Sequence, residues 1–136
     1  MKFKPILLVA FVLALASGGC AGKARHIATV TVVSAKGALD IAQDTEPLLV
    51  CGAASAPAAP ACVTPDAHKA IHGTLADAYA IHKQLATAVR DWPQGQPAPA
   101  TIPTYLAQIT DLLQRVLDSL PPGSVKDRLT ALLGGK

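Results

Sequence analysis

Two histidines four residues apart are the clearest metal-ligand candidates in the sequence. His68 and His72 fall within "HKAIH", in a segment with helical periodicity. Side chains at i and i+4 lie on the same face of a helix, so the two imidazoles could bind one metal ion. The motif lacks the glutamate that serves as general base in H-E-x-x-H metalloproteases. We therefore predict that both histidines lie at the solvent edge beside the apolar face, with no metal or other noncovalent cofactor, and we retain the pair as candidate ligands.

Other residue types that carry chemistry are not arranged for catalysis. The sequence has neither G-x-S-x-G nor S-x-x-K, and no glycine-rich loop that could hold a phosphate. Asp40 and Asp44 are one helical turn apart, on what we interpret as a solvated charged face. His82 lies at the margin of an apolar face, where a packed and hydrogen-bonded ring is expected, and His26 is expected to be solvated. We predict that the protein is not an enzyme.

The first residues have the three zones of a secretory signal peptide. Lys2 and Lys4 precede an apolar run over residues 6–16, and small residues follow. The run has roughly 11 residues, whereas a membrane-spanning helix needs about 20. The segment therefore predicts export and removal of the signal rather than a permanent transmembrane helix.

The end of this segment resembles the lipobox of bacterial lipoproteins. Ser17-Gly18-Gly19-Cys20 fits its permissive form, with serine where leucine is commonest. The resemblance implies a signal peptide over residues 1–19, a covalent diacylglycerol on Cys20 and a lipidated tether over residues 20–26. Ala21 resembles the sorting signal for an outer-membrane lipoprotein that faces the periplasm. The alternative is ordinary cleavage after Ala16, which gives a secreted or periplasmic soluble protein with Cys20 as a free thiol.

The other two cysteines form an even pair once Cys20 carries lipid. An exported protein enters an oxidising compartment, where Cys51 and Cys62 are expected to form a disulfide. The loop between them, "CGAASAPAAPAC", has little cohesion of its own. Closing it would stabilise the fold by roughly 3 kcal/mol in the chain-entropy model. A metal site is the alternative, but the pair lacks the C-x-x-C spacing that zinc sites favour.

Charge and aromatic content argue against a nucleic-acid partner. The chain has 12 basic and 9 acidic residues, and Lys2 and Lys4 belong to the predicted signal peptide. The remaining cations are scattered, and the aromatic residues after the signal are Tyr79, Trp92 and Tyr105. Nucleic-acid binding normally requires a basic stripe with stacking aromatics.

Three segments have clear helix signals. The first is capped by Thr64, opens at Pro65 and should end at Pro93. Its predicted core face is Ile71, Leu75, Ala78, Leu85, Val89 and Trp92. The second runs from about residue 101 to 120, with a core face of Tyr105, Leu106, Ile109, Leu112, Leu113, Val116, Leu117 and Leu120. A short C-terminal helix from about residue 124 directs Val125, Leu129, Leu132 and Leu133 inward.

The segment from Arg25 to Cys51 is ambiguous. Residues 27–33 are rich in β-branched side chains and could form a strand, but no second strand-like run exists to pair with it. We therefore predict a helix that ends near Glu46, because Pro47 cannot continue it. Its predicted core face is Ile27, Val30, Ser34, Ala38, Ile41, Thr45 and Leu48. Its predicted solvent face is Lys36, Asp40, Gln43 and Asp44.

Together these elements predict an all-α fold, a small up-and-down helical bundle of three main helices plus a short C-terminal helix. The helical domain covers residues 27–136 and contains the closed loop from Cys51 to Cys62. We expect a lipid-anchored, non-enzymatic envelope protein with a structural or partner-binding role. Its expected contacts are the membrane, through the lipid, and a protein partner or a second copy. The alternatives are a phage or mobile-element envelope lipoprotein that acts in exclusion or lysis, and a metal-binding envelope protein that uses His68 and His72.

Overall fold

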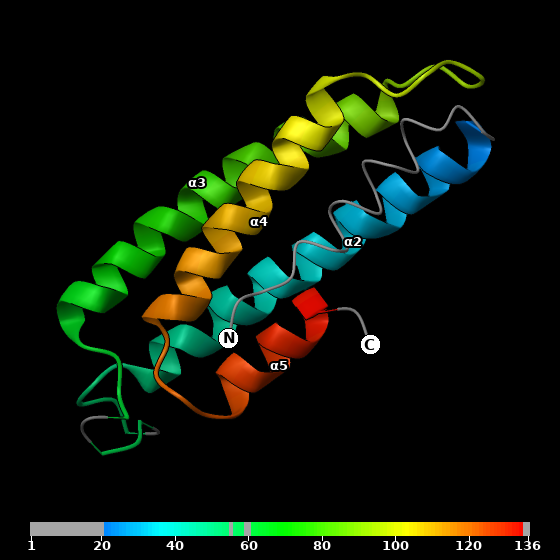
Figure 1. Ribbon diagram of the computed structural model, residues 1–136. Helices are drawn as coiled ribbons and strands as arrows, with labels where there is room; N and C mark the ends of the chain where they lie inside the picture. The colour runs from blue at the N-terminus through cyan, green and yellow to red at the C-terminus, as the bar shows by residue number, and fades with distance from the viewer. Residues whose placement is uncertain (1–20, 55, 59–60, 135–136) are drawn as a thin grey trace.

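The computed structural model describes residues 21–54, 56–58 and 61–134. It contains α2 (Ala21–Thr45), the 3-10 helix η1 (Glu46–Leu49), α3 (Pro65–Arg90), α4 (Thr101–Ser119) and α5 (Ser124–Gly134). The three long helices run alternately up and down, and α5 lies beside the C-terminal half of α2 (Figure 1). The described residues form no strand, so the predicted all-α bundle is confirmed.

The predicted signal peptide and Cys20 lie outside the described residues. α2 begins at Ala21, so the described part of the expected tether is already helical. None of the helices in the described ranges is both long and apolar enough to cross a membrane.

The helix α3 follows the sequence prediction closely. The Thr64 hydroxyl accepts a hydrogen bond from the Ala67 backbone N–H at 3.2 Å, and Pro65 occupies the first turn. The helix ends at Arg90, shortly before Pro93. All six residues of its predicted core face are buried. Capping and apolar spacing agree here, and the prediction is confirmed.

α4 packs against α3 and completes the most extensive helix pair of the bundle. Ile102, which the sequence analysis did not select, is fully buried in its first turn. Tyr105 and Leu112 of the predicted face are half-buried, and the other six predicted residues are buried. In α5, Leu129 is buried and Val125 is half-buried, whereas the side chains of Leu132 and Leu133 lie outside those that the structure describes.

α2 is a helix as predicted, but most of its predicted core face is wrong. Ile27, Val30 and Leu48 are 40%, 50% and 53% exposed. The residues that α2 buries are instead Ala28, Ala35, Ala38, Leu39 and Ala42, of which only Ala38 was predicted. Four of these five are alanines, whose small side chains let a neighbouring helix approach closely. The β-branched Ile27, Val30 and Val33 are exposed, whereas Val32 and Ile41 are partly buried against the core.

Candidate metal centre

A buried carboxylate lies at the junction between α2 and the disulfide loop. Thr45 ends α2, and Pro47 directs the chain into η1, whose first residue is Glu46. Glu46 is 0% exposed and is the one buried charged residue among those described. A carboxylate at such a depth requires a partner, because burial of an uncompensated charge costs several kcal/mol.

The partners of this carboxylate come from the beginning of α3. His68 and His72 lie one turn apart, and their rings meet edge to face with centroids 4.8 Å apart and an interplanar angle of 70°. The Nδ1 atom of His68 lies 2.8 Å from each carboxylate oxygen of Glu46. One ligand atom from each of the three residues falls within 4.8 Å of the other two. The structure therefore brings the predicted histidine pair together with a third potential ligand.

The chain between Glu46 and His68 is held closed by backbone and covalent bonds. Cys51 and Cys62 form a disulfide with their Cα atoms 4.9 Å apart, as predicted. Val50 and Val63 pair as an isolated parallel bridge, in which Val63 N–H donates to the Leu49 carbonyl at 2.7 Å. The end of α2 and the start of α3 are thereby fixed side by side, which places Glu46 against the first turns of α3.

Glu46 was not predicted as a ligand from the sequence. It is 22 residues from His68, so no local spacing rule connects them. The available signal was indirect: the predicted disulfide closes the hairpin, and the predicted break at Pro47 places Glu46 at the hairpin end. A residue at the end of one helix meets the first turns of the next helix in such a hairpin.

The arrangement suits a transition-metal ion that accepts nitrogen and oxygen ligands. Zinc binds histidine nitrogen at about 2.0–2.1 Å and carboxylate oxygen at about 2.0–2.2 Å, so ligand atoms around a tetrahedral ion lie about 3.3 Å apart. Glu46 and His68 are slightly closer than this. His72 is exposed, so its side chain can turn toward the pair without disturbing the core. A metal ion bound at His68 Nδ1 would take the place of the hydrogen bond between this atom and Glu46.

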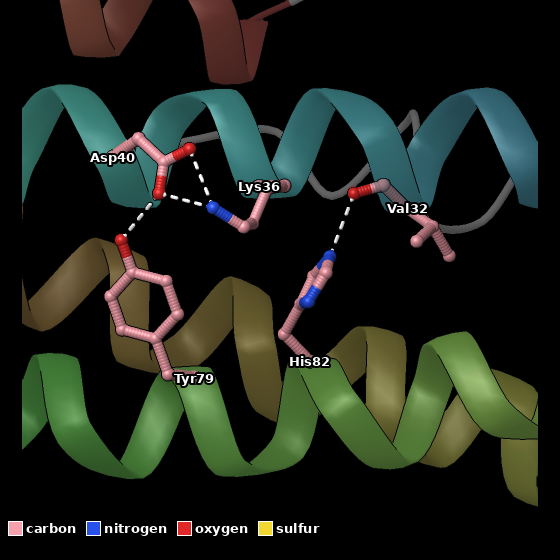
Figure 2. Close-up of polar contacts among 5 residues, drawn as sticks. All are labelled: Val32, Lys36, Asp40, Tyr79 and His82. Carbon is pink, nitrogen blue, oxygen red and sulfur yellow. Dashed lines mark hydrogen bonds and ion pairs between the residues drawn. The ribbon is translucent and has the colours of Figure 1, made fainter.

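A second polar cluster lies midway along the interface between α2 and α3 (Figure 2). The hydroxyl of Tyr79 donates to the Asp40 carboxylate at 2.6 Å, and Lys36 donates to both oxygens of the same carboxylate at 2.6 and 2.7 Å. Asp40 was predicted to be on a solvated face, but it faces α3 and is only partly exposed. Asp44 is exposed, as predicted.

Both groups in this contact have shifted pKa values. The hydrogen bonds from Lys36 and then from Tyr79 lower the pKa of Asp40 below its ordinary value. Burial, followed by the hydrogen bond to Asp40, raises the pKa of Tyr79 above its ordinary value. The folded protein therefore favours a charged carboxylate and a neutral phenol, which is the pairing that the geometry requires.

The remaining histidines behave as predicted. The Nε2 atom of His82 lies 2.9 Å from the backbone carbonyl of Val32, which makes His82 a packed, hydrogen-bonded residue across the interface of α2 and α3 (Figure 2). His26 is exposed near the start of α2. Neither contributes to the candidate metal centre.

Comparisons of the chain with protein-family models, with curated proteins and with solved structures found no significant match.

Proposed function

We propose that this protein is a lipid-anchored bacterial envelope protein whose helical domain binds a transition-metal ion through Glu46, His68 and His72. The observation that carries the metal-binding proposal is the fully buried carboxylate of Glu46 beside two imidazoles from the start of α3. The role is binding rather than catalysis.

The chemistry of the three ligands narrows the choice of ion. Imidazole nitrogen suits zinc, copper and nickel, whereas calcium and magnesium prefer sites made entirely of oxygen. A divalent ion would offset the charge of the buried carboxylate directly. Three protein ligands leave at least one position for water or for a group from a partner.

The disulfide supports the proposed location in the cell envelope. Disulfides persist in oxidising compartments such as the periplasm. The pairing of Cys51 with Cys62 also leaves Cys20 as the odd cysteine, next to the residues that resemble a lipobox. In this proposal all three cysteines have a role, and a membrane anchor precedes the helical domain.

Calorimetric titration of zinc and copper tests the site. The protein would be the processed chain with Cys20→Ala, made without a histidine tag. We expect one bound ion per chain with low-micromolar affinity or better. Glu46→Gln keeps the size and a hydrogen-bonding group while removing the charge, and should weaken binding roughly tenfold or more.

Two further variants make the result decisive. His68→Ala/His72→Ala should abolish binding, whereas His26→Ala, an exposed histidine at the other end of α2, should bind as the parent does. Circular dichroism would establish that each variant is folded. Unchanged affinity in the folded double variant would refute the proposed site.

A further inference from the structure

The N-terminal half of α2 exposes a row of large apolar side chains. Ile27, Val30 and Val33 are 40%, 50% and 67% exposed and follow one another at intervals of three residues. Leu48, in η1, is the only other large apolar residue of comparable exposure among the described residues. Exposed apolar side chains are ordinary when scattered, but three successive ones on one helix form a contiguous surface.

Positive charge lies at the N-terminal end of this apolar row. Lys23 and Arg25 precede it, and α2 has no acidic residue before Asp40. We refer to Lys23, His26, Ile27, Val30 and Val33 as the basic-apolar face, and Arg25 lies toward the adjoining groove.

A groove of about 520 Å³ adjoins the basic-apolar face. Arg25, His26 and Val33 border it from α2, and Arg90 and Trp92 border it from the end of α3 and the following turn. Arg90 donates to Asp91 at 2.9 Å, and both side chains remain more than half exposed. The groove therefore combines an apolar floor with cationic side chains at its edge.

Within the part of the chain that the structure describes, the bundle leaves this face uncovered. α5 packs along the C-terminal half of α2, on the far side of the molecule from the turn that joins α3 to α4 (Figure 1). Among the described residues, no other element packs over Val30 or Val33, as their exposure shows.

We propose that the basic-apolar face docks on an anionic phospholipid bilayer. Ile27, Val30 and Val33 would enter the boundary between headgroups and acyl chains, as the apolar face of an interfacial helix does. The cations would contact lipid phosphates, and each lysine or arginine near an anionic surface adds to the attraction.

Charge favours a bilayer over a second copy of the chain as the occupant. A symmetric dimer through this face would bring Lys23 of one copy near Lys23 of the other, with Arg25 close by in each copy, and the face has no acidic residue to offset them. An anionic lipid surface supplies the missing negative charge. The inference does not require acylation of Cys20 or a bound metal, because it depends only on side chains of α2 and the adjoining groove.

Vesicle sedimentation tests the inference with the processed, unacylated Cys20→Ala chain. We expect it to sediment with vesicles of equimolar phosphatidylglycerol and phosphatidylcholine, and to remain largely in solution with phosphatidylcholine alone. Raising the salt concentration should release most of the bound protein, because the attraction between exposed charges is screened.

Matched variants identify the surface. Val30→Asp/Val33→Asp should reduce the bound fraction at least about fivefold, since two negative charges would face the anionic lipid. Thr104→Asp/Gln108→Asp places the same two charges on exposed positions of α4 and should bind far better. Arg25→Glu should weaken binding, and Lys69→Glu, an exposed cation on α3, should change it less.

Three outcomes would overturn the inference. They are equal binding to neutral and anionic vesicles, binding that Val30→Asp/Val33→Asp leaves intact, and a dimer without vesicles that the same variant dissociates. The last result would identify a second copy as the occupant. Zinc titration of each variant distinguishes the loss of membrane binding from the loss of metal binding, because the metal site lies at the opposite end of α2.

Discussion

At the residue scale, the Tyr79 hydroxyl donates to a carboxylate that must be charged for the contact to stabilise the folded state. The pKa of Asp40 is lower in the folded protein than in the unfolded chain, so the folded state binds fewer protons in acid. The stabilisation is complete above the ordinary carboxyl pKa of about 3.9 and is lost as the pH falls through the lower, folded-state value.

Tyr79→Phe tests this linkage. Loss of the hydroxyl should lower the free energy of unfolding by about 1 kcal/mol near neutral pH, a modest value because Asp40 is partly exposed. The difference from the parent should shrink as Asp40 becomes protonated below about pH 4. Denaturant unfolding at several pH values measures it, with Tyr105→Phe on α4 as the control. A loss that is equal at every pH would contradict the assigned role of Asp40.

The candidate site shows which residue-level features a sequence can predict. His68 and His72 are close in the chain, and their shared helix face follows from periodicity alone. Glu46 belongs to the site through the tertiary path of the hairpin, which depends on the disulfide and on the break before Pro47. Local spacing therefore predicts two of the three ligands.

At the element scale, α3 and α4 could be predicted because several independent signals coincide. Thr64 and Pro65 define the start of α3, prolines follow both helices, and large apolar residues mark each core face. In α2 these signals conflict. Three of its large apolar residues, Ile27, Val30 and Val33, are on the outside, and the buried face is mostly alanine, so hydrophobicity alone selects the wrong side.

Paired truncations on α2 test the corrected face. Leu39 is fully buried, so Leu39→Ala should lower the free energy of unfolding by about 2–5 kcal/mol. Val30 is half exposed, so Val30→Ala should change the free energy of unfolding by no more than about 0.5 kcal/mol. Thermal or urea unfolding of both variants gives the comparison. Similar losses of unfolding free energy in the two variants would instead support the core face predicted from the sequence.

At the scale of the whole molecule, the order of the helices separates two surfaces with different chemistry. The hairpin between α2 and α3 closes one end of the bundle and contains the candidate metal centre. The basic-apolar face begins at the other end, near the residues that follow Cys20. The 25 residues of α2 correspond to roughly 37 Å at 1.5 Å per residue, and this length separates the two ends.

Lipid attachment at Cys20 is a prediction about the whole chain. Cells that express the full chain should incorporate labelled palmitate into it, and Cys20→Ala should abolish the label. Cys51→Ser/Cys62→Ser, which removes the disulfide but keeps the lipobox-like residues, should retain the label. Equal labelling of the parent and the Cys20→Ala variant would exclude this attachment point.

The fluorescence of Trp92 can report on binding at one end of the bundle because of the position of this residue. It is the only tryptophan in the chain and is 2% exposed, and its indole N–H donates to the Gln96 carbonyl at 2.8 Å. Its ring also borders the groove beside the basic-apolar face, far from His68 and His72. Tryptophan emission therefore reports on one end of the bundle alone. Quenching by brominated lipid would register contact at that end, while an ion bound at the other end would leave the emission nearly unchanged.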